Sequence, residues 1–317
     1  MIRRAIVGLI LAVYPAALTP AQAQAQDTVI RVAVRLVHML VTVKDANGQL
    51  ISSLNKSDFT VFDNGVKQDI AVFERQTEQP LSVALMVDTS ASTGIEMHYE
   101  LDSVRKFLRA LVVEGNPRDA LALYSFNWQV TLQTAYTRRF ERLDQALRQL
   151  RSEGGTSLYD AIFLGSRELE YREGRHVMVV VTDGGDTTSF KDFHQALEAA
   201  QRADIVLYPV VVVPITNDAG RNIGGENALA TLAAGTGGRV FTPSSAGELD
   251  RVFEDILREL RTQYLIGYYP KDIPPTKDRY HMLKVTVQEP RDAKGLRVVT
   301  RSGYYGDADA SARGSRR

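Results

Sequence analysis

The chain of 317 residues contains no cysteine. Disulfide bonds, thiolate zinc sites, cysteine nucleophiles and a lipid-modified cysteine behind an export signal are therefore excluded. The chain also has a formal net charge of zero, because 38 lysines and arginines balance 38 aspartates and glutamates. Without an overall positive field, the composition does not favour nucleic acid or an anionic membrane surface as a partner.

Patterns typical of enzymes are also missing. The five histidines are scattered along the chain without the spacing of metal ligands. The sequence has neither a nucleophile elbow nor a phosphate-binding loop, and no histidine or lysine stands where a general base would be expected. We therefore predict that the protein is not an enzyme.

A long mostly apolar stretch occurs at the N-terminus, where residues 5–18 follow two arginines. Small residues in an Ala-x-Ala pattern come next, as in a secretory signal peptide. The stretch is shorter than the roughly 20 residues of a membrane-spanning helix, although an uncleaved anchor is the alternative. We expect residues 1–25 to be a signal peptide, and the mature chain to lie in the periplasm or outside the cell without a transmembrane segment.

Two segments of alternating hydrophobicity flank the middle of the chain. In residues 26–79, alternation around Val37–Val43 and turn signals such as Asn47-Gly48 predict short strands. In residues 264–306, alternation over 283–287 predicts a strand, with residues 296–301 as its hairpin partner. Each flank has too few strands to be stable alone. We expect them to pair into one small sandwich-like all-β unit, followed by a disordered tail at residues 307–317.

Between the flanks, residues 80–263 alternate between buried strands and amphipathic helices. The runs 83–87, 177–181 and 205–213 are almost purely apolar, as expected of strands covered on both faces of a parallel sheet. Helical periodicity separates these runs. The pattern predicts a doubly wound, mostly parallel α/β sheet inserted into the β unit.

Polar residues gather where two of these strands end. Asp88 follows the first buried run and begins the motif Asp-x-Ser-x-Ser with Ser90 and Ser92, while Asp183 follows the run 177–181. Thr156 follows two glycines in front of a helix and can reach the same edge. In open α/β sheets, ligands bind at the carboxyl ends of the strands.

Two carboxylates brought together there would repel each other unless a cation lay between them. Oxygen ligands without histidine or cysteine suit Mg²⁺ best, with Mn²⁺ or Ca²⁺ as alternatives. Protein side chains alone would leave one coordination position open, which a carboxylate from a partner can fill. Helix capping by the two serines is the simpler alternative for that motif alone.

These residues resemble the metal-ion-dependent adhesion site of von Willebrand factor type A domains. The resemblance rests on Asp88-Thr89-Ser90-Ala91-Ser92, on Gly154-Gly155-Thr156 and on Thr182-Asp183-Gly184-Gly185. It implies that Ser90, Ser92 and Thr156 contact the cation directly, and that the two aspartates hold it largely through waters. The flanks look like those of the exported von Willebrand factor A-related family best known from acidobacterial genomes.

The sequence thus predicts an exported protein that binds a divalent cation and, through it, a protein partner. Two other functions stay open. The first is a structural envelope protein in which the metal only stabilises the fold. The second is a metal-dependent hydrolase, which the absences described above disfavour.

Export gives the first testable prediction. Cleavage after Ala23 or Ala25 produces a mature chain that begins at Gln24 or Gln26. N-terminal sequencing of the protein from the envelope or the medium measures this directly. Recovery of the full-length chain from the cytoplasm would contradict both the signal peptide and the localisation.

Overall fold

The computed structural model describes residues 36–75, 79–91, 97–212, 222–274, 276, 279–288 and 295–306, without the side chains of residues 97–100. The chain divides into Met1–Val34 and Arg35–Arg317, and all described residues belong to the second part. The predicted signal peptide, the predicted tail and Ser92 lie outside the described residues.

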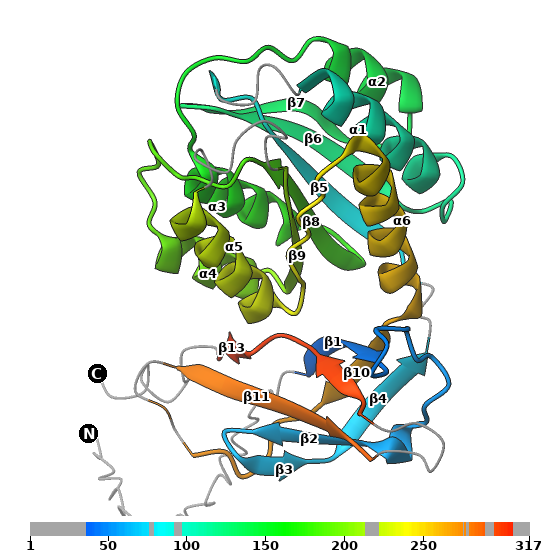
Figure 1. Cartoon of the computed structure of the whole chain (residues 1–317). Helices are drawn as coiled ribbons and strands as arrows, with labels where there is room; N and C mark the ends of the chain where they lie inside the picture. The colour runs from blue at the N-terminus through cyan, green and yellow to red at the C-terminus, as the bar shows by residue number, and fades with distance from the viewer. Residues whose placement is uncertain are drawn as a thin grey trace, which may run out of the picture. The chain divides into compact units, whose positions relative to one another are not determined.

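A five-stranded sheet in the order β7-β6-β5-β8-β9 forms the centre of the α/β region (Figure 1). Its strands are β5 (Leu81–Asp88), β6 (Ala120–Phe126), β7 (Val130–Thr137), β8 (Arg175–Thr182) and β9 (Ile205–Val211). Four of them are parallel, and β7 is an antiparallel strand at one edge. The apolar runs predicted from the sequence are the buried strands β5, β8 and β9.

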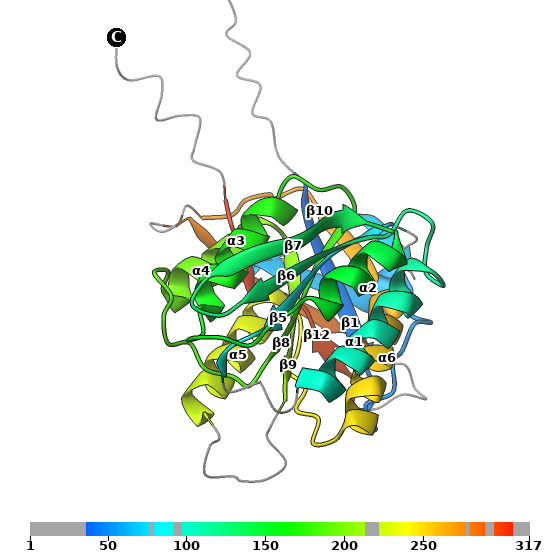
Figure 2. The same ribbon diagram turned by 90° about the horizontal axis from the view of Figure 1, so that it is seen from above.

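Helices cover the two faces of this sheet (Figure 2). One face carries α1, α2 and α6, and the other carries α3, α4 and α5. Their bounds are α1 (Met97–Val112), α2 (Phe140–Arg148), α3 (Leu158–Leu169), α4 (Phe193–Arg202), α5 (Ile223–Thr236) and α6 (Ala246–Thr262). Asn222 caps the N-terminus of α5, and Gly237 ends the helix in a left-handed conformation.

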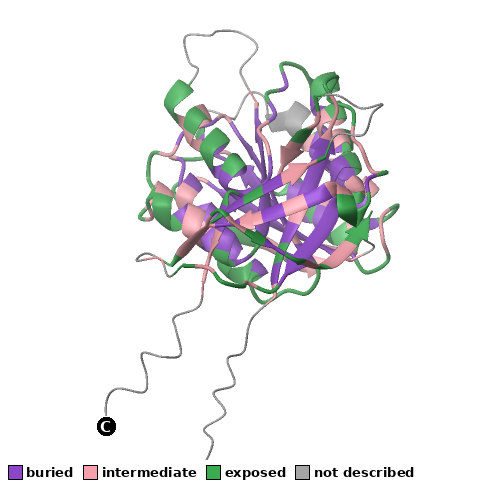
Figure 3. Cartoon of the chain, turned by 90° about the horizontal axis from the view of Figure 1, so that it is seen from below, coloured by how far each residue is buried: buried purple, intermediate pink, exposed green. Residues whose placement is uncertain are grey.

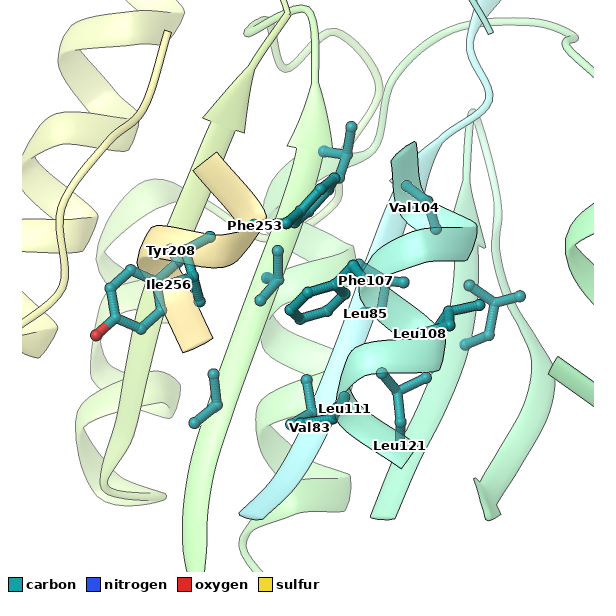
Figure 4. Close-up of a cluster of buried hydrophobic side chains, with 14 of the residues drawn as sticks. Val83, Leu85, Val104, Phe107, Leu108, Leu111, Leu121, Tyr208, Phe253 and Ile256 are labelled. Atoms are coloured by element: carbon teal, nitrogen blue, oxygen red, sulfur yellow. The ribbon is translucent and has the colours of Figure 1, made fainter. Parts of the chain in front are cut away.

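The strands β5, β6, β8 and β9 are buried on both faces, whereas the edge strand β7 is partly exposed (Figure 3). On the face of α1 and α6, side chains of β5 pack between the helices, and the rings of Phe107 and Phe253 stack with their centroids 4.8 Å apart (Figure 4). Burial of this apolar area is the main force that holds the α/β region together.

The flanks build two four-stranded antiparallel sheets, with strand orders β12-β1-β10-β4 and β13-β11-β2-β3. The N-terminal flank supplies β1 (Val37–Lys44), a 3-10 turn (Lys56–Asp58), β2 (Phe59–Asp63), β3 (Val66–Gln68) and β4 (Ile70–Arg75). The C-terminal flank supplies β10 (Tyr264–Tyr268), β11 (Tyr280–Val287), β12 (Arg297–Val299) and β13 (Gly303–Tyr305). Each sheet contains strands from both flanks, so the two flanks pair as expected.

One predicted pairing is wrong. Residues 296–301 do not form a hairpin with 283–287, because β12 pairs with β1 and β13 pairs with the start of β11. The 283–287 part of β11 is paired with β2 instead. Thr300 Oγ1 donates to the carbonyl oxygen of Leu40 at 2.9 Å, which fixes the segment after β12 beside β1.

A buried carboxylate of α6 connects this helix to the flanking sheets and to the rest of the α/β region. Glu259 is almost fully buried and accepts hydrogen bonds from Lys44 Nζ of β1 at 2.7 Å, from Arg239 Nε at 3.1 Å and from Tyr208 OH at 3.1 Å. A buried carboxylate with two cations and a hydroxyl is well compensated.

Within the described part of the chain, no helix is long and apolar enough to cross a membrane.

The pairing of the flanks yields the second prediction. Ile266 of β10 is fully buried and lies between Met39 of β1 and Phe73 of β4, so it contacts the core of both neighbouring strands. We expect Ile266→Ala to lower the free energy of unfolding by about 2–5 kcal/mol through lost burial and a residual cavity. Urea denaturation measures this change.

The exposed Tyr269, three residues further on, provides the matched control. Tyr269→Ala should change the free energy of unfolding by no more than about 0.5 kcal/mol. Equal stability of Ile266→Ala and the wild type would contradict a shared core between the two flanks.

Candidate metal centre

The candidate site begins at the ends of two neighbouring parallel strands. Asp88 is the last residue of β5, and Thr182 is the last residue of β8. Thr182 Oγ1 donates a hydrogen bond of 2.6 Å to Asp88 Oδ2, and the backbone N–H of Ser90 donates one of 2.8 Å to Asp88 Oδ1. These bonds fix the carboxylate in place. Asp88 is also buried, with only 1% of its surface exposed.

Burial has an electrostatic consequence for Asp88. Loss of hydration raises the pKa of Asp88 to about 6, and the nearby negative charge of Asp183 acts in the same direction. Hydrogen bonds from Thr182 and Ser90 oppose this shift of the pKa but do not cancel it. A cation beside the two carboxylates would offset the cost of keeping Asp88 ionised.

The loop that carries Thr156 is attached to the loop after β5. The N–H of Ala91 donates to the carbonyl oxygen of Gly154 at 3.1 Å, and the N–H of Glu153 donates to that of Thr89 at 2.8 Å. Gly154 has a φ of +73°, a left-handed conformation that glycine adopts without strain. These bonds bring the buried Thr156 close to the loop of Asp88 and Ser90.

A third loop, which follows β8, holds Thr156 from the other side. Thr187 Oγ1 accepts from the N–H of Thr156 at 2.8 Å, and the N–H of Thr187 donates to the carbonyl oxygen of Thr156 at 2.8 Å. The half-buried Asp183 opens this loop. Gly184 follows with a φ of +107°, a conformation that side-chain-bearing residues rarely adopt.

Four of the five predicted ligands are described, and they lie on three loops that hydrogen-bond to one another. The fifth, Ser92, lies outside the described residues. Among the described residues, no group of three or more histidine, aspartate or glutamate side chains could hold a metal. The described candidate donors at this edge are the two carboxylates and the hydroxyl groups of Ser90 and Thr156, which fit a hard cation that prefers oxygen.

Two further aspartates at this edge have structural roles. The N-terminus of α4 is capped by Asp192 and not by Asp186. Asp186 Oδ1 instead accepts from the N–H of Tyr159 at 3.2 Å, at the first turn of α3. Asp160 lies in the first turn of α3, and its carboxylate accepts the N–H groups of residues 190 and 191. Both aspartates thus connect the loop after β8 to α3.

Trp128, the single tryptophan of the chain, lies beside the loop of Thr156. It is 56% exposed, and a Cβ atom on Gly154 would come within 2.3 Å of its ring. In the structure, one part of the ring packs on Gly154 and the rest faces solvent.

Sequence reasoning missed the hydroxyl groups that position the ligands. Thr182 holds Asp88, Thr187 holds the backbone of Thr156, and Thr188 Oγ1 is 2.8 Å from Ser157 Oγ. The position of Thr182 directly before Asp183, at the end of a buried strand, was a usable signal. The roles of Thr187 and Thr188 depend on the packing of two distant loops and had no local signal.

Comparison with known proteins gives the same picture of the α/β region. The family model of the von Willebrand factor type A domain matches residues 82–255, more than half of the chain. An uncharacterized protein of Mycobacterium tuberculosis is 31% identical over 128 residues, which are 40% of this chain. The chain matches only 18% of the length of that relative.

Solved structures with a similar fold include the vWF domain of the type V pili tip protein Mfa5 from Porphyromonas gingivalis. It is 12% identical, with a TM-score of 0.49, over 57% of this chain and 95% of that one. A von Willebrand factor type A protein from Catenulispora acidiphila is 10% identical, with a TM-score of 0.48, over 86% of this chain and 74% of that one. On the match of the family model, the chain belongs to the von Willebrand factor type A domain family.

Proposed function

We propose that the protein binds a divalent cation at the carboxyl edge of the central sheet and, through it, a carboxylate of a protein partner. The ligands are Asp88, Ser90, Ser92, Thr156 and Asp183. The observation that carries the proposal is the network of hydrogen bonds that joins three loops around the buried Asp88. Mg²⁺ is the preferred ion, and Mn²⁺ or Ca²⁺ can replace it.

The chemistry of the edge supports a cation. Two carboxylates lie close enough for Asp183 to raise the pKa of Asp88, and like charges in a site of low dielectric are unfavourable without a counter-ion. Hydroxyl oxygens of Ser90 and Thr156 are neutral donors from two different loops. Oxygen donors of this kind suit Mg²⁺, which retains several waters when protein ligands are few.

A protein partner follows from the small number of charged ligands. Two carboxylates and neutral hydroxyls leave the cation able to accept a further carboxylate, which a glutamate or aspartate of another protein can supply. Membership in the von Willebrand factor type A family supports a role in protein interaction. Together with the predicted signal peptide, this favours an adhesion or binding protein of the periplasm or the cell exterior over an enzyme.

The metal site can be tested with Asp88→Ala. The change removes a negative charge and a water-holding group, so we expect Mg²⁺ binding at millimolar concentrations to be abolished. Calorimetric titration with Mg²⁺ and Mn²⁺ measures it, and fluorescence of Trp128 beside the Thr156 loop provides a second readout. Metal-free stability should stay the same or rise, since repulsion with Asp183 is removed. Equal metal affinity of the two proteins would refute the site.

Thr182 provides a more conservative test of the same site. Thr182→Val keeps the shape of the side chain but removes the hydroxyl that holds Asp88. Loss of such an outer contact lowers metal affinity by about 10–100-fold. Thr182→Ser retains the hydroxyl and should keep metal affinity near that of the wild type. Wild-type affinity in Thr182→Val would show that this bond does not position the ligand.

The partner requires a separate experiment, a pull-down from envelope extract in the presence of Mg²⁺ or a chelator. We expect a protein to be retained with Mg²⁺ and released by the chelator. Thr156→Ala should keep some metal but weaken retention, because its hydroxyl contacts the cation mainly in the ligand-competent form. A purely structural metal predicts a lower melting temperature without Mg²⁺ and no metal-dependent retention, and that result would overturn the binding function.

A further inference from the structure

A cavity of about 430 Å³ lies at the edge of the central sheet opposite to Asp88. Its wall includes the first residues of β8 and β9, together with residues of β1 and β10 from the flanking sheets. Pockets that bind small molecules have volumes in this range and occur preferentially where domains meet. The proposed metal site has no residue in common with this cavity.

The wall of the cavity contains a buried arginine that forms no direct ion pair with a carboxylate among the described residues. Arg175, the first residue of β8, is 6% exposed, and its Nη1 donates to the carbonyl oxygen of Leu260 at the end of α6. Its Nε is buried without a hydrogen-bond partner, and no carboxylate in the described part of the chain forms an ion pair with it. Burial lowers the pKa of Arg175 to about 10, and the nearby Asp119 opposes this shift without forming an ion pair with the guanidinium group. A buried charge that lacks a partner is costly.

Two more guanidinium groups face the same space. Arg301 is 8% exposed and uses its two Nη atoms to donate to Asp204 and to the carbonyl oxygen of His38, while its Nε is buried without a partner. Arg118 lies at the exposed rim. Of the two acidic residues in the wall, Glu173 and Asp204, the latter is already paired with Arg301. The buried part of the wall therefore carries donors for an anion.

The remainder of the wall is apolar and includes Leu40, Ile205, Val206 and Leu265. An inorganic anion would leave this surface without a partner. Guanidinium groups match the geometry of a carboxylate with two parallel hydrogen bonds. We propose that the cavity binds a small organic acid, with its carboxylate at Arg175 and Arg301 and its apolar body against the side chains of β1, β9 and β10.

A ligand bound in this cavity would contact both the flanking sheets and the α/β region. A molecule that binds only the folded chain raises its melting temperature, and the increase grows with the logarithm of ligand concentration above the Kd. The same molecule supplies a direct ion-pair partner for Arg175, which no carboxylate among the described residues provides. Binding should therefore be detectable both as heat and as thermal stabilisation, with or without Mg²⁺.

The test uses the full mature chain with hexanoate and benzoate as probes, at constant ionic strength and with chelator present. We expect both carboxylates to bind in the millimolar range or more tightly and to raise the melting temperature. Hexanol has a similar apolar body without the charge, and phosphate has charge without an apolar body. Each should bind at least about tenfold more weakly, since each lacks one of the two contacts.

Variants separate a ligand site from structural arginines. Arg175→Met should lower the affinity for hexanoate at least about tenfold, because it removes the buried fork that receives the carboxylate. Its ligand-free melting temperature should stay the same or rise, since an uncompensated buried charge is replaced by an apolar side chain. Should this variant fail to fold, Arg118→Ala at the rim should still weaken hexanoate binding. Arg261→Ala removes an exposed arginine outside the cavity and should leave binding unchanged.

Three results would overturn the proposal. The first is the absence of heat and of thermal stabilisation with either carboxylate. The second is equal or tighter binding of phosphate or hexanol than of hexanoate. The third is wild-type affinity for hexanoate in both Arg175→Met and Arg118→Ala. None of these results bears on the metal site, which is tested by Mg²⁺ titration of other variants.

Discussion

Burial of β5 on both faces is the constraint on which the candidate metal site depends. All eight residues of the strand are buried, and parallel neighbours on both sides use its backbone hydrogen bonds. A charged side chain can therefore occur only where the strand ends. Asp88 stands at that end, held by Thr182 of the adjacent strand and by the backbone of Ser90. Rigid strands thus fix the carboxylate, while loops supply the hydroxyls.

The opposite edge of the sheet has a different role, because the chain enters and leaves the α/β region there. β4 ends at Arg75 shortly before β5 begins, and α6 leads directly into β10. Strands before and after the α/β region then pair within the same two sheets. Glu259 adds a buried link from α6 to Lys44 of β1. Contacts between the two regions therefore concentrate at this edge, where the cavity with Arg175 is found.

Much of this arrangement could be predicted from the sequence, because continuous apolar runs report burial on two faces. Those runs located β5, β8 and β9, and the polar residues at their ends located the candidate ligands. The partner of residues 297–299 could not be predicted, since an alternating pattern fits any open strand edge. Burial of Arg175 was equally hidden, because an arginine before an apolar run looks like an exposed strand start until the flanking sheets are placed against it.

The number of carboxylates decides what the proposed cation can do. A site with three or four acidic ligands satisfies a divalent ion within the chain and stabilises the fold, as in dedicated calcium loops. Among the described residues, this edge brings together no group of three or more acidic or histidine side chains. Asp88 and Asp183 carry two negative charges, which equal the charge of a divalent ion. The hydroxyl groups are neutral and add no further negative charge. In the function proposed above, a cation held in this way would accept a third carboxylate from outside the chain, and this is the physical reason for proposing adhesion rather than a purely structural role.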